Sequence, residues 1–370
     1  MLSAIQIGTD AVDRAVMGGI EGGIYPAAVV VIGTSDRVVY ARGYGHFTWD
    51  ASSAVPDPDS SLFDLASLTK VLATTSALMV LADRGRVALR RPVVQYLPGF
   101  AGEGKEAVTV RHLLQHRSGL RAFLPLDQMA ATAGEARDLV LHEPLRWSAG
   151  GRVEYSDLNA MLLGWIVEAA GGMPLDRFVA RAVFEPLDMR QTRFRPPADL
   201  RARIVPVGLW RGQPVSGSVH DQNAARFGGV SGHAGLYGTG SDVARYAQMM
   251  LRRGTTRDGS RLIRTGTIDL FLRRGSGNRA LGWEMRDTTS SDNSGTLFSA
   301  NAYGHTGYTG TSVWIDPDRD LFVVFLTNRV FAPRTARSIS GLKRVRGEVA
   351  DAAVRLLEGC DDRSDGTARC

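Results

Sequence analysis

Ser67 and Lys70 stand at the start of an apolar stretch, at the spacing that places a hydroxyl and an amine on one helix face. A helix N-terminus has free amide donors and positive potential, so a serine there can attack a carbonyl while its own N–H holds the oxyanion. Burial and that potential both disfavour an ammonium, so we expect a lowered pKa for Lys70 and a role as a base. The pair indicates nucleophilic catalysis through a covalent intermediate.

Lysine is rare in this chain, because only three of the 44 basic residues are lysines. Arginine keeps its proton in proteins, whereas a desolvated lysine can release it. The Ser-x-x-Lys pattern recurs once, at Ser340 and Lys343, with Arg337, Arg344 and Arg346 around it. We interpret this second copy and its arginines as a solvated helix face. The buried character of the stretch that follows the first copy favours the first copy as the site.

Two other groups of residues could contribute to a site. Tyr155 and Asp157 open a helical pattern, where a tyrosine most often serves packing. His305, Thr306 and Gly307 lie at the Gly-rich end of a strand pattern, where a ligand or another backbone can come close. Taken alone, neither group assigns a chemistry.

Hydrophobic periodicity predicts the elements that must position these residues. Two runs, 27–32 and 37–44, flank a Gly-containing turn and predict a hairpin, and residues 67–82 predict a buried helix. Further helices are predicted at 9–19, 241–251 and 340–357, and further strands at 300–304, 311–315 and 320–327. Between them lie mainly helical patterns with few strand signals, at 110–116, 134–141, 158–170 and 175–183.

This order of elements predicts an α+β fold assembled from both ends of the chain. We expect one discontinuous α/β lobe from residues 1–85 and 236–358, with a helical lobe, 86–235, inserted between its parts. Residues 359–370 form a polar tail that contains Cys360 and Cys370, which could pair in an oxidising compartment but indicate no chemistry.

The three groups of residues occur in a defined order: Ser-x-x-Lys at 67–70, Tyr-Ser-Asp at 155–157 and His-Thr-Gly at 305–307. In that order the chain resembles the superfamily of serine β-lactamases and penicillin-binding proteins. The branch that it resembles includes class C β-lactamases, D-aminopeptidases, D-Ala-D-Ala carboxypeptidases and family VIII carboxylesterases. The resemblance extends over residues 10–357 and includes residues 108–120, 219–235 and 304–317.

The resemblance implies a role for each of these residues. It makes Ser67 the acylated nucleophile, with Lys70 and Tyr155 sharing general base and acid work. It places the oxyanion hole at the backbone N–H groups of Ser67 and of Tyr308, the residue after His-Thr-Gly. It implies a β-lactamase/transpeptidase-like fold, in which helices flank an antiparallel sheet and the site lies in a cleft beside a mostly helical lobe.

Two residues depart from the family's pattern, because Asp157 stands where Asn is common and His305 where Lys is common. In β-lactamases and carboxypeptidases that Lys helps to hold the substrate carboxylate, and a mostly neutral imidazole holds an anion less well near pH 7. We therefore expect a serine hydrolase that favours a short-chain ester, and we expect protonation of His305 near pH 6 to improve its action on anionic substrates. A β-lactamase, a D-Ala-D-Ala carboxypeptidase or D-aminopeptidase, and a non-catalytic binding protein on the same fold remain alternatives.

Rival chemistries have weaker support in the sequence. The nearest approach to a Gly-x-Ser-x-Gly elbow, at residues 229–233, lacks its last glycine. His112 and His116 have the spacing of a metal-ligand pair on a helix, but no third ligand is evident and core or capping roles are favoured. A phosphate-binding Gly-rich loop with Lys is absent. We expect neither a metal nor a cofactor.

Composition sets limits on partners and location. The 370-residue chain is 44% hydrophobic and carries a formal net charge of +6, but its arginines lack the aromatic interleaving of single-strand binders. The expected partner is thus a small-molecule ester, β-lactam or peptide and not a nucleic acid, and the oligomeric state is left open.

The longest apolar run, 71–82, is shorter than the roughly 18–20 residues of a membrane span. Residues 1–10 show no signal-peptide pattern, so a cytoplasmic protein is expected, or a periplasmic or secreted one if the chain is a mature form or its start is mis-assigned.

Overall fold

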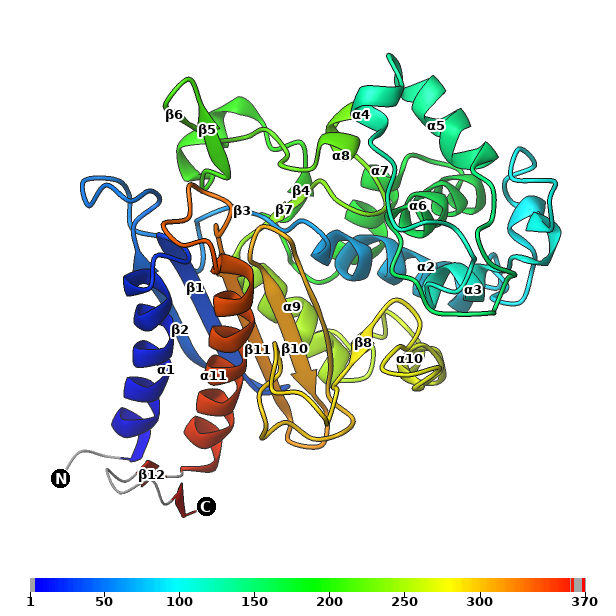
Figure 1. Ribbon diagram of the computed structural model, residues 1–370. Coiled ribbons are helices and arrows are strands. Elements are labelled where there is room, and N and C mark those ends of the chain that lie inside the picture. The colour runs from blue at the N-terminus through cyan, green and yellow to red at the C-terminus, as the bar shows by residue number, and fades with distance from the viewer. Residues whose placement is uncertain (1–3, 360, 363–367, 370) are drawn as a thin grey trace.

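The computed structural model describes residues 4–359, 361–362 and 368–369, and its centre is a six-stranded antiparallel sheet (Figure 1). Cys360 and Cys370 lie outside the described residues, so their pairing stays a prediction. The strand order is β2-β1-β11-β10-β9-β8, so the two ends of the chain meet inside one sheet. The strands are β1 (Ala27–Gly33), β2 (Val38–Gly45), β8 (Glu284–Met285), β9 (Tyr303–Thr306), β10 (Ser312–Asp316) and β11 (Leu321–Thr327).

The neighbouring strands β1 and β11 are buried on both faces, which explains their continuous apolar sequences. Alternate residues of β1 pack into different hydrophobic clusters: Val29 and Val31 into one, Val30 and Ile32 into the other. The strand β11 divides in the same way, with Val324 on the side of Val29 and Val31. A sheet with two buried faces must be covered by helices on both sides.

Helices from both chain ends cover one face of this sheet. The helices α1 (Ala4–Glu21) and α11 (Ser338–Glu358) lie side by side on it in Figure 1, where Val12, Val16 and Val349 enter the second cluster. The helix α9 (Gly240–Leu251) packs against β1, β10 and β11 from the opposite face.

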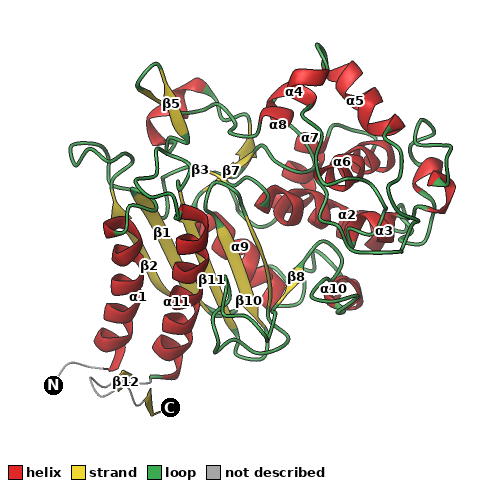
Figure 2. Cartoon of the chain, in the orientation of Figure 1, coloured by secondary structure: helices red, strands yellow, loops and turns green. Residues whose placement is uncertain are grey.

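Most of the remaining helices form a second group beside the sheet, on the right of Figure 2. Its centre is a helical rod made of a π-helical segment, Lys70–Thr75, and α2 (Ser76–Asp83), which packs against α6 (Asp157–Gly171). The other helices are α3 (Val110–Leu114), α4 (Leu126–Met129), α5 (Ala133–His142), α7 (Leu175–Val179), α8 (Gln222–Arg226) and α10 (Thr265–Leu272). Short 3-10 or π segments cover Val93–Gln95, Lys105–Ala107, Ala180–Phe184 and Ala198–Arg203.

Seven short strands form small ribbons outside the main sheet. They pair in the orders β3-β7-β4, β5-β6 and β12-β13. At two or three residues each they are too short for a periodic signal, which is why the sequence between 86 and 235 showed few strands. They are β3 (Phe63–Asp64), β4 (Arg193–Phe194), β5 (Gly208–Trp210), β6 (Gln213–Val215), β7 (Leu236–Gly238), β12 (Asp361–Asp362) and β13 (Ala368–Arg369).

The predicted α+β fold with an antiparallel sheet is confirmed, whereas the lobe boundaries at residues 85 and 235 stay a prediction. The predicted helix over 67–82 exists, but Ser67 lies in the turn that precedes it and the first helical residue is Leu68. Among the described residues, no single helix is both long and apolar enough to cross a membrane. The two segments Asp157–Gly171 and Leu175–Phe184, bent by 71°, meet the length and composition criteria only as a pair.

Candidate active site

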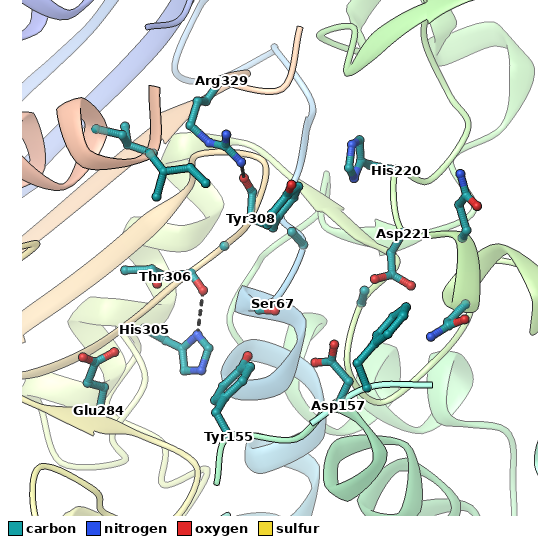
Figure 3. A pocket seen from close by; sticks show the side chains of 18 of the residues that line it. Ser67, Tyr155, Asp157, His220, Asp221, Glu284, His305, Thr306, Tyr308 and Arg329 are labelled. Atoms are coloured by element: carbon teal, nitrogen blue, oxygen red, sulfur yellow. Dashed lines mark hydrogen bonds between the residues drawn. The ribbon is translucent and has the colours of Figure 1, made fainter. Parts of the chain in front are cut away.

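A pocket of about 730 Å³ opens beside Ser67 and gathers the residues that the sequence singled out (Figure 3). The turn before the helical rod places Ser67 at the floor of the pocket, and residues of β9 and the loop after it form another wall. The predicted site residues on its surface are Ser67, Tyr155, Asp157, His305, Thr306, Gly307 and Tyr308. Lys70 lies beneath this surface, with only 4% of its side chain exposed.

A strained turn presents Ser67 to the pocket. The residue before it, Ala66, has a left-handed backbone with φ of 47°, which costs a residue with a Cβ about 1–2 kcal/mol. The carboxylate of Asp64 offsets this by accepting a hydrogen bond from the Ala66 N–H at 2.9 Å. The Leu68 and Thr69 N–H groups then bond back to Leu65 and Ala66 at 3.0 Å, so the chain enters the helix at once. The Ser67 hydroxyl is therefore fixed at the head of the helical rod.

Lys70 contacts three groups from different parts of the chain. Its ammonium donates to Ser67 Oγ at 2.8 Å and to the carbonyl of His233 at 3.1 Å, and it forms a 2.7 Å ion pair with Asp157 Oδ1. Burial alone lowers the pKa of Lys70, but Asp157 and Tyr155 together outweigh burial and raise that pKa above its usual value. The expectation of a lowered Lys70 pKa is therefore wrong, because it did not include the carboxylate that the fold brings to this amine.

Tyr155 and Asp157 enter the site at the start of α6. The Tyr155 ring lies 4.6 Å from the ring of His116, and the Lys70 ammonium lies 5.1 Å from the centre of the Tyr155 ring. His116 accepts a hydrogen bond from the Ser156 N–H at 3.1 Å through Nδ1, which holds the backbone between the two site residues. The packing against His116 and Lys70 directs the Tyr155 hydroxyl toward the side of Ser67 (Figure 3).

The two amides proposed for the oxyanion hole are held in one framework. Within the described part of the chain, neither the Ser67 N–H nor the Tyr308 N–H donates a hydrogen bond. Thr309 donates to the Asp64 carbonyl at 2.7 Å, and Thr311 donates to the Leu65 carbonyl at 3.0 Å. These bonds tie the loop after β9 to the turn that carries Ser67. The arrangement can therefore offer two free amide donors to one oxygen.

Gly307 and its neighbour His305 shape the wall next to these amides. A side chain at position 307 would place its Cβ 2.2 Å from Thr311 Oγ1 and 2.7 Å from the Leu65 carbonyl, so only glycine fits. His305 is 3% exposed, and its Nδ1 lies 2.9 Å from the Thr306 carbonyl. A carbonyl only accepts, so Nδ1 carries the proton, and Nε2 has no partner among the described residues.

The charge of His305 differs from the expectation at mildly acidic pH. Burial, followed by the positive charges of Lys70 and Arg279, lowers the pKa of His305 to about 3. The imidazole is thus neutral at pH 6 as well as at pH 7, and the expected gain on protonation near pH 6 is wrong. The physical reason is the burial of the imidazole, to which the two neighbouring cations add.

Several residues that the sequence did not assign also belong to the site. The guanidinium of Arg279 lies 5.4 Å from the centre of the Tyr155 ring, and Arg329 and Arg346 are only 5% and 7% exposed on the opposite wall. The arginines near the C-terminus looked like solvated surface because composition alone does not show which helix face packs inward. The interpretation of Arg346 as solvated is therefore wrong, since it faces the sheet and the pocket.

A buried histidine supports Lys70 through its backbone. His233 Nδ1 lies 2.8 Å from Ser231 Oγ, and His233 Nε2 lies 2.9 Å from Asp221 Oδ1. Burial raises the pKa of Asp221, but His233 outweighs burial and holds that pKa well below its usual range. Because the imidazole is held on both sides, the His233 carbonyl that contacts Lys70 is held as well. The 229–233 segment is thus a support for Lys70 and not a nucleophile elbow.

The two histidines considered as metal ligands serve separate structural roles. His112 Nδ1 accepts from the Thr109 N–H at 3.3 Å and completes the cap of α3, whereas His116 supports Tyr155. Within the described residues, no group of three or more His, Cys, Asp or Glu side chains is arranged to hold a metal ion.

Comparisons with known proteins agree with this architecture. A family model described as Beta-lactamase matches residues 12–345. The chain is 33% identical to the "N-acetylmuramyl-L-alanine amidase" of Bacillus subtilis, with 87% of this chain and 81% of that protein covered. It is 32% identical to the "Putative D-alanyl-D-alanine carboxypeptidase" of Escherichia coli K12, with 84% and 80% covered.

A solved structure shares the fold over nearly its whole length. The hydrolase EstCE1, described as having promiscuous acyltransferase activity, has a TM-score of 0.77 at 21% identity and covers 95% of this chain and 99% of its own. The family model and the two relatives each match most of this chain, so the assignment rests on the whole fold and not on isolated motifs. The chain belongs to the beta-lactamase family and has the fold of penicillin-binding proteins.

Proposed function

We propose that the protein is a serine hydrolase that cleaves an ester or amide through an acyl-enzyme at Ser67. The observation that carries this proposal is the 2.8 Å contact between the Lys70 ammonium and Ser67 Oγ, at the floor of the pocket. The two free amides of Ser67 and Tyr308 support it, because a tetrahedral oxyanion needs such donors. A binding protein has no need for a buried ammonium on a pocket serine.

In the proposed reaction, Ser67 Oγ attacks the carbonyl carbon and its proton passes to the Lys70–Tyr155 pair. Asp157 favours the state in which the proton shared by this pair resides on Lys70, so the Tyr155 oxygen is the acceptor for the Ser67 proton. Collapse of the tetrahedral intermediate breaks the bond to the leaving group, which takes that proton. Water then attacks the acyl carbon with the same groups in reverse roles.

For the substrate, a short-chain ester is our first candidate, because the buried neutral His305 supplies no charge for a carboxylate. A peptide with a terminal carboxylate is the second candidate. Arg279 favours it, since its guanidinium lines the pocket and forms no ion pair or hydrogen bond with the described residues. The names of the two relatives, an amidase and a carboxypeptidase, are consistent with this second candidate.

A substrate panel separates these candidates. The values of kcat/KM are measured for p-nitrophenyl acetate, nitrocefin and a diacylated Lys-D-Ala-D-Ala peptide, with Ser67→Ala as the blank. We expect the ester to give the highest value, whereas a higher value for the peptide would assign the second candidate. If no substrate is turned over and no serine-reactive phosphonate labels Ser67, the proposal of a serine hydrolase is wrong.

A further inference from the structure

Two buried arginines lie directly behind the loop that contributes the Tyr308 amide. Arg329 follows β11 and is 5% exposed, and Arg346 belongs to α11 and is 7% exposed. Neither guanidinium forms a salt bridge with any described residue. Burying a cation without a carboxylate is unfavourable unless other groups compensate, so the partners of these two side chains require an explanation.

Their partners are backbone carbonyls on both sides of the Tyr308 amide. Arg346 Nη2 donates to the Gly307 carbonyl at 3.2 Å and to the Thr311 carbonyl at 2.8 Å. Arg329 donates to the Tyr308 carbonyl, and its guanidinium lies 4.7 Å from the centre of the Tyr308 ring (Figure 3). The peptide units before and after Tyr308 are thus each held by a charged donor.

We propose that Arg346 and Arg329 are positioning residues for the oxyanion hole, which fix and polarise the peptide units on either side of Tyr308. The inference rests on the proposed function, because it needs an oxyanion to form at Ser67. In a trans peptide the carbonyl and the N–H point in opposite directions. A guanidinium on the Gly307 carbonyl therefore orients the Tyr308 N–H away from α11, into the pocket.

The electrostatics of this wall favour an anion. Burial, followed by the charge of Arg329, lowers the pKa of Arg346 to about 9, which reflects two like charges held close together in a desolvated place. A negative oxygen at the Tyr308 N–H would relieve that repulsion in the transition state and not in the neutral ground state. A charged donor on the carbonyl also polarises the amide, so its N–H becomes a stronger donor.

The loop contains two glycines, whose backbone is not restricted by a side chain, so its amide needs support from outside the loop. Its sequence contains Gly307 and Gly310, and the φ of Gly310 is 114°, a region that favours glycine. Among the described residues, the backbone bond to the Gly307 carbonyl comes from the Gly310 N–H at 3.1 Å, within the same loop. Arg346 adds a hydrogen bond from the long helix α11 to the Gly307 carbonyl. Arg346 is itself held by Asn293, whose Oδ1 accepts from Arg346 Nη1 at 3.1 Å. The amide is thereby held by rigid parts of the fold.

The test compares Arg346→Met with a matched control on the same helix. Arg344→Met removes an exposed guanidinium that pairs with Glu348 at 2.6 Å and does not line the pocket. The measurements are kcat per titrated site and KM for p-nitrophenyl acetate, and Ki for phenylboronic acid, whose tetrahedral adduct places an oxygen in the hole. For Arg346→Met we expect kcat to fall about 10–100-fold and Ki to rise by the same factor, with KM within about twofold. Arg344→Met should match the wild type.

A role in stability alone would give a different result. It would lower the melting temperature and the fraction of titratable sites, while kcat per titrated site and Ki for the boronic acid stayed at wild-type values. That result would overturn the inference. Arg346→Lys can keep one charged bond and should recover part of kcat. If Arg346→Met fails to fold, Arg329→Met tests the other peptide unit with the same measurements, and unchanged kcat and Ki there would equally overturn the inference.

Failure of the inference and failure of the proposed function are distinguishable. Phosphonate labelling of the wild type reports on Ser67 alone. Suppose that the wild type is labelled at Ser67 and that kcat is unchanged in the arginine variants. The proposal of a serine hydrolase then still holds, and only the proposed role of the arginines is wrong.

Discussion

The chain contains the Ser-x-x-Lys pattern twice, and the two copies have different environments. At the first, Lys70 is 4% exposed and donates to Ser67 at 2.8 Å. At the second, Lys343 is 45% exposed and lies 3.7 Å from Asp292, while the Ser340 hydroxyl donates to the Arg337 carbonyl at 3.2 Å. The lysine of the second copy reaches the rim of the pocket, but its serine bonds back to its own helix.

The difference arises from the structural elements that cover each helix start. A second group of elements covers the first copy and delivers the Asp157 carboxylate and the His233 carbonyl to Lys70. At the second copy, Lys343 stays exposed to solvent and meets a carboxylate, that of Asp292, only on a neighbouring loop of the described chain. The spacing of a motif determines which side chains can come into contact. Burial of the motif between two groups of elements determines whether those side chains can act as catalytic groups.

The largest expected effect separates the two serines. Ser67→Ala should lower kcat by about 10⁴-fold or more, because the nucleophile itself is removed, whereas Ser340→Ala should leave kcat unchanged. Intact-mass analysis after reaction with a serine-reactive phosphonate should show one adduct in the wild type, mapped to the peptide with Ser67. An adduct on Ser340, or one that persists in Ser67→Ala, would contradict the assignment.

The two lysines should differ by a smaller factor. Lys70→Arg should lose at least about 10²-fold in kcat, because the planar guanidinium does not fit a site closed by Ser67, Asp157 and His233 and cannot hold Ser67 Oγ as the ammonium does. Lys343→Arg is the matched control and should keep its activity. If Lys70→Arg remained active, any positive charge beneath Ser67 would suffice, and the geometry of the Lys70 ammonium would not matter.

The charge at position 305 tests substrate choice. His305→Lys should raise kcat/KM for the anionic substrate nitrocefin by about tenfold, the lower end of what one charge-assisted hydrogen bond contributes, and should barely change the value for p-nitrophenyl acetate. In the wild type, His305 takes up a proton only around pH 3, so it should produce no gain on nitrocefin between pH 7 and pH 6. If His305→Lys changed kcat/KM equally for both substrates, residue 305 would shape the oxyanion hole and would not recognise the charge of the substrate.

The smallest expected effect is a displacement of the pH profile in Asp157→Asn. Asp157 raises the pKa of Lys70 against the effect of burial, so its removal lets that pKa fall. Lys70 then loses its proton at a lower pH. The alkaline limb of the pH profile of kcat should therefore move down by about one pH unit, with little change on the acidic limb. Asp292→Asn, beside Lys343, serves as the control. An unmoved alkaline limb in Asp157→Asn would show that this carboxylate does not govern Lys70.

The sequence predicted the parts of the site that depend on local pattern. The hairpin at 27–44, the C-terminal strands and the order of the three motifs all follow from periodicity and residue type, and the structure gathers those motifs in one pocket. The protonation of Lys70 did not follow, because its ion pair with Asp157 forms only in the folded chain. The burial of Arg346 did not follow either, since an arginine-rich helix shows its inner face only once it packs on a sheet.

The pairing of β1 with β11 has a consequence for how the protein is made. The Ala27 N–H bonds to Asn328, 301 residues further along the chain. At roughly 5–20 residues per second, a ribosome releases the partner strand only after roughly 15–60 s. Ser67 emerges early, but Tyr308 and Arg346 emerge near the end. A nascent chain therefore carries the proposed nucleophile without the proposed oxyanion hole until its last helix has docked, and its unpaired apolar strands need protection from aggregation.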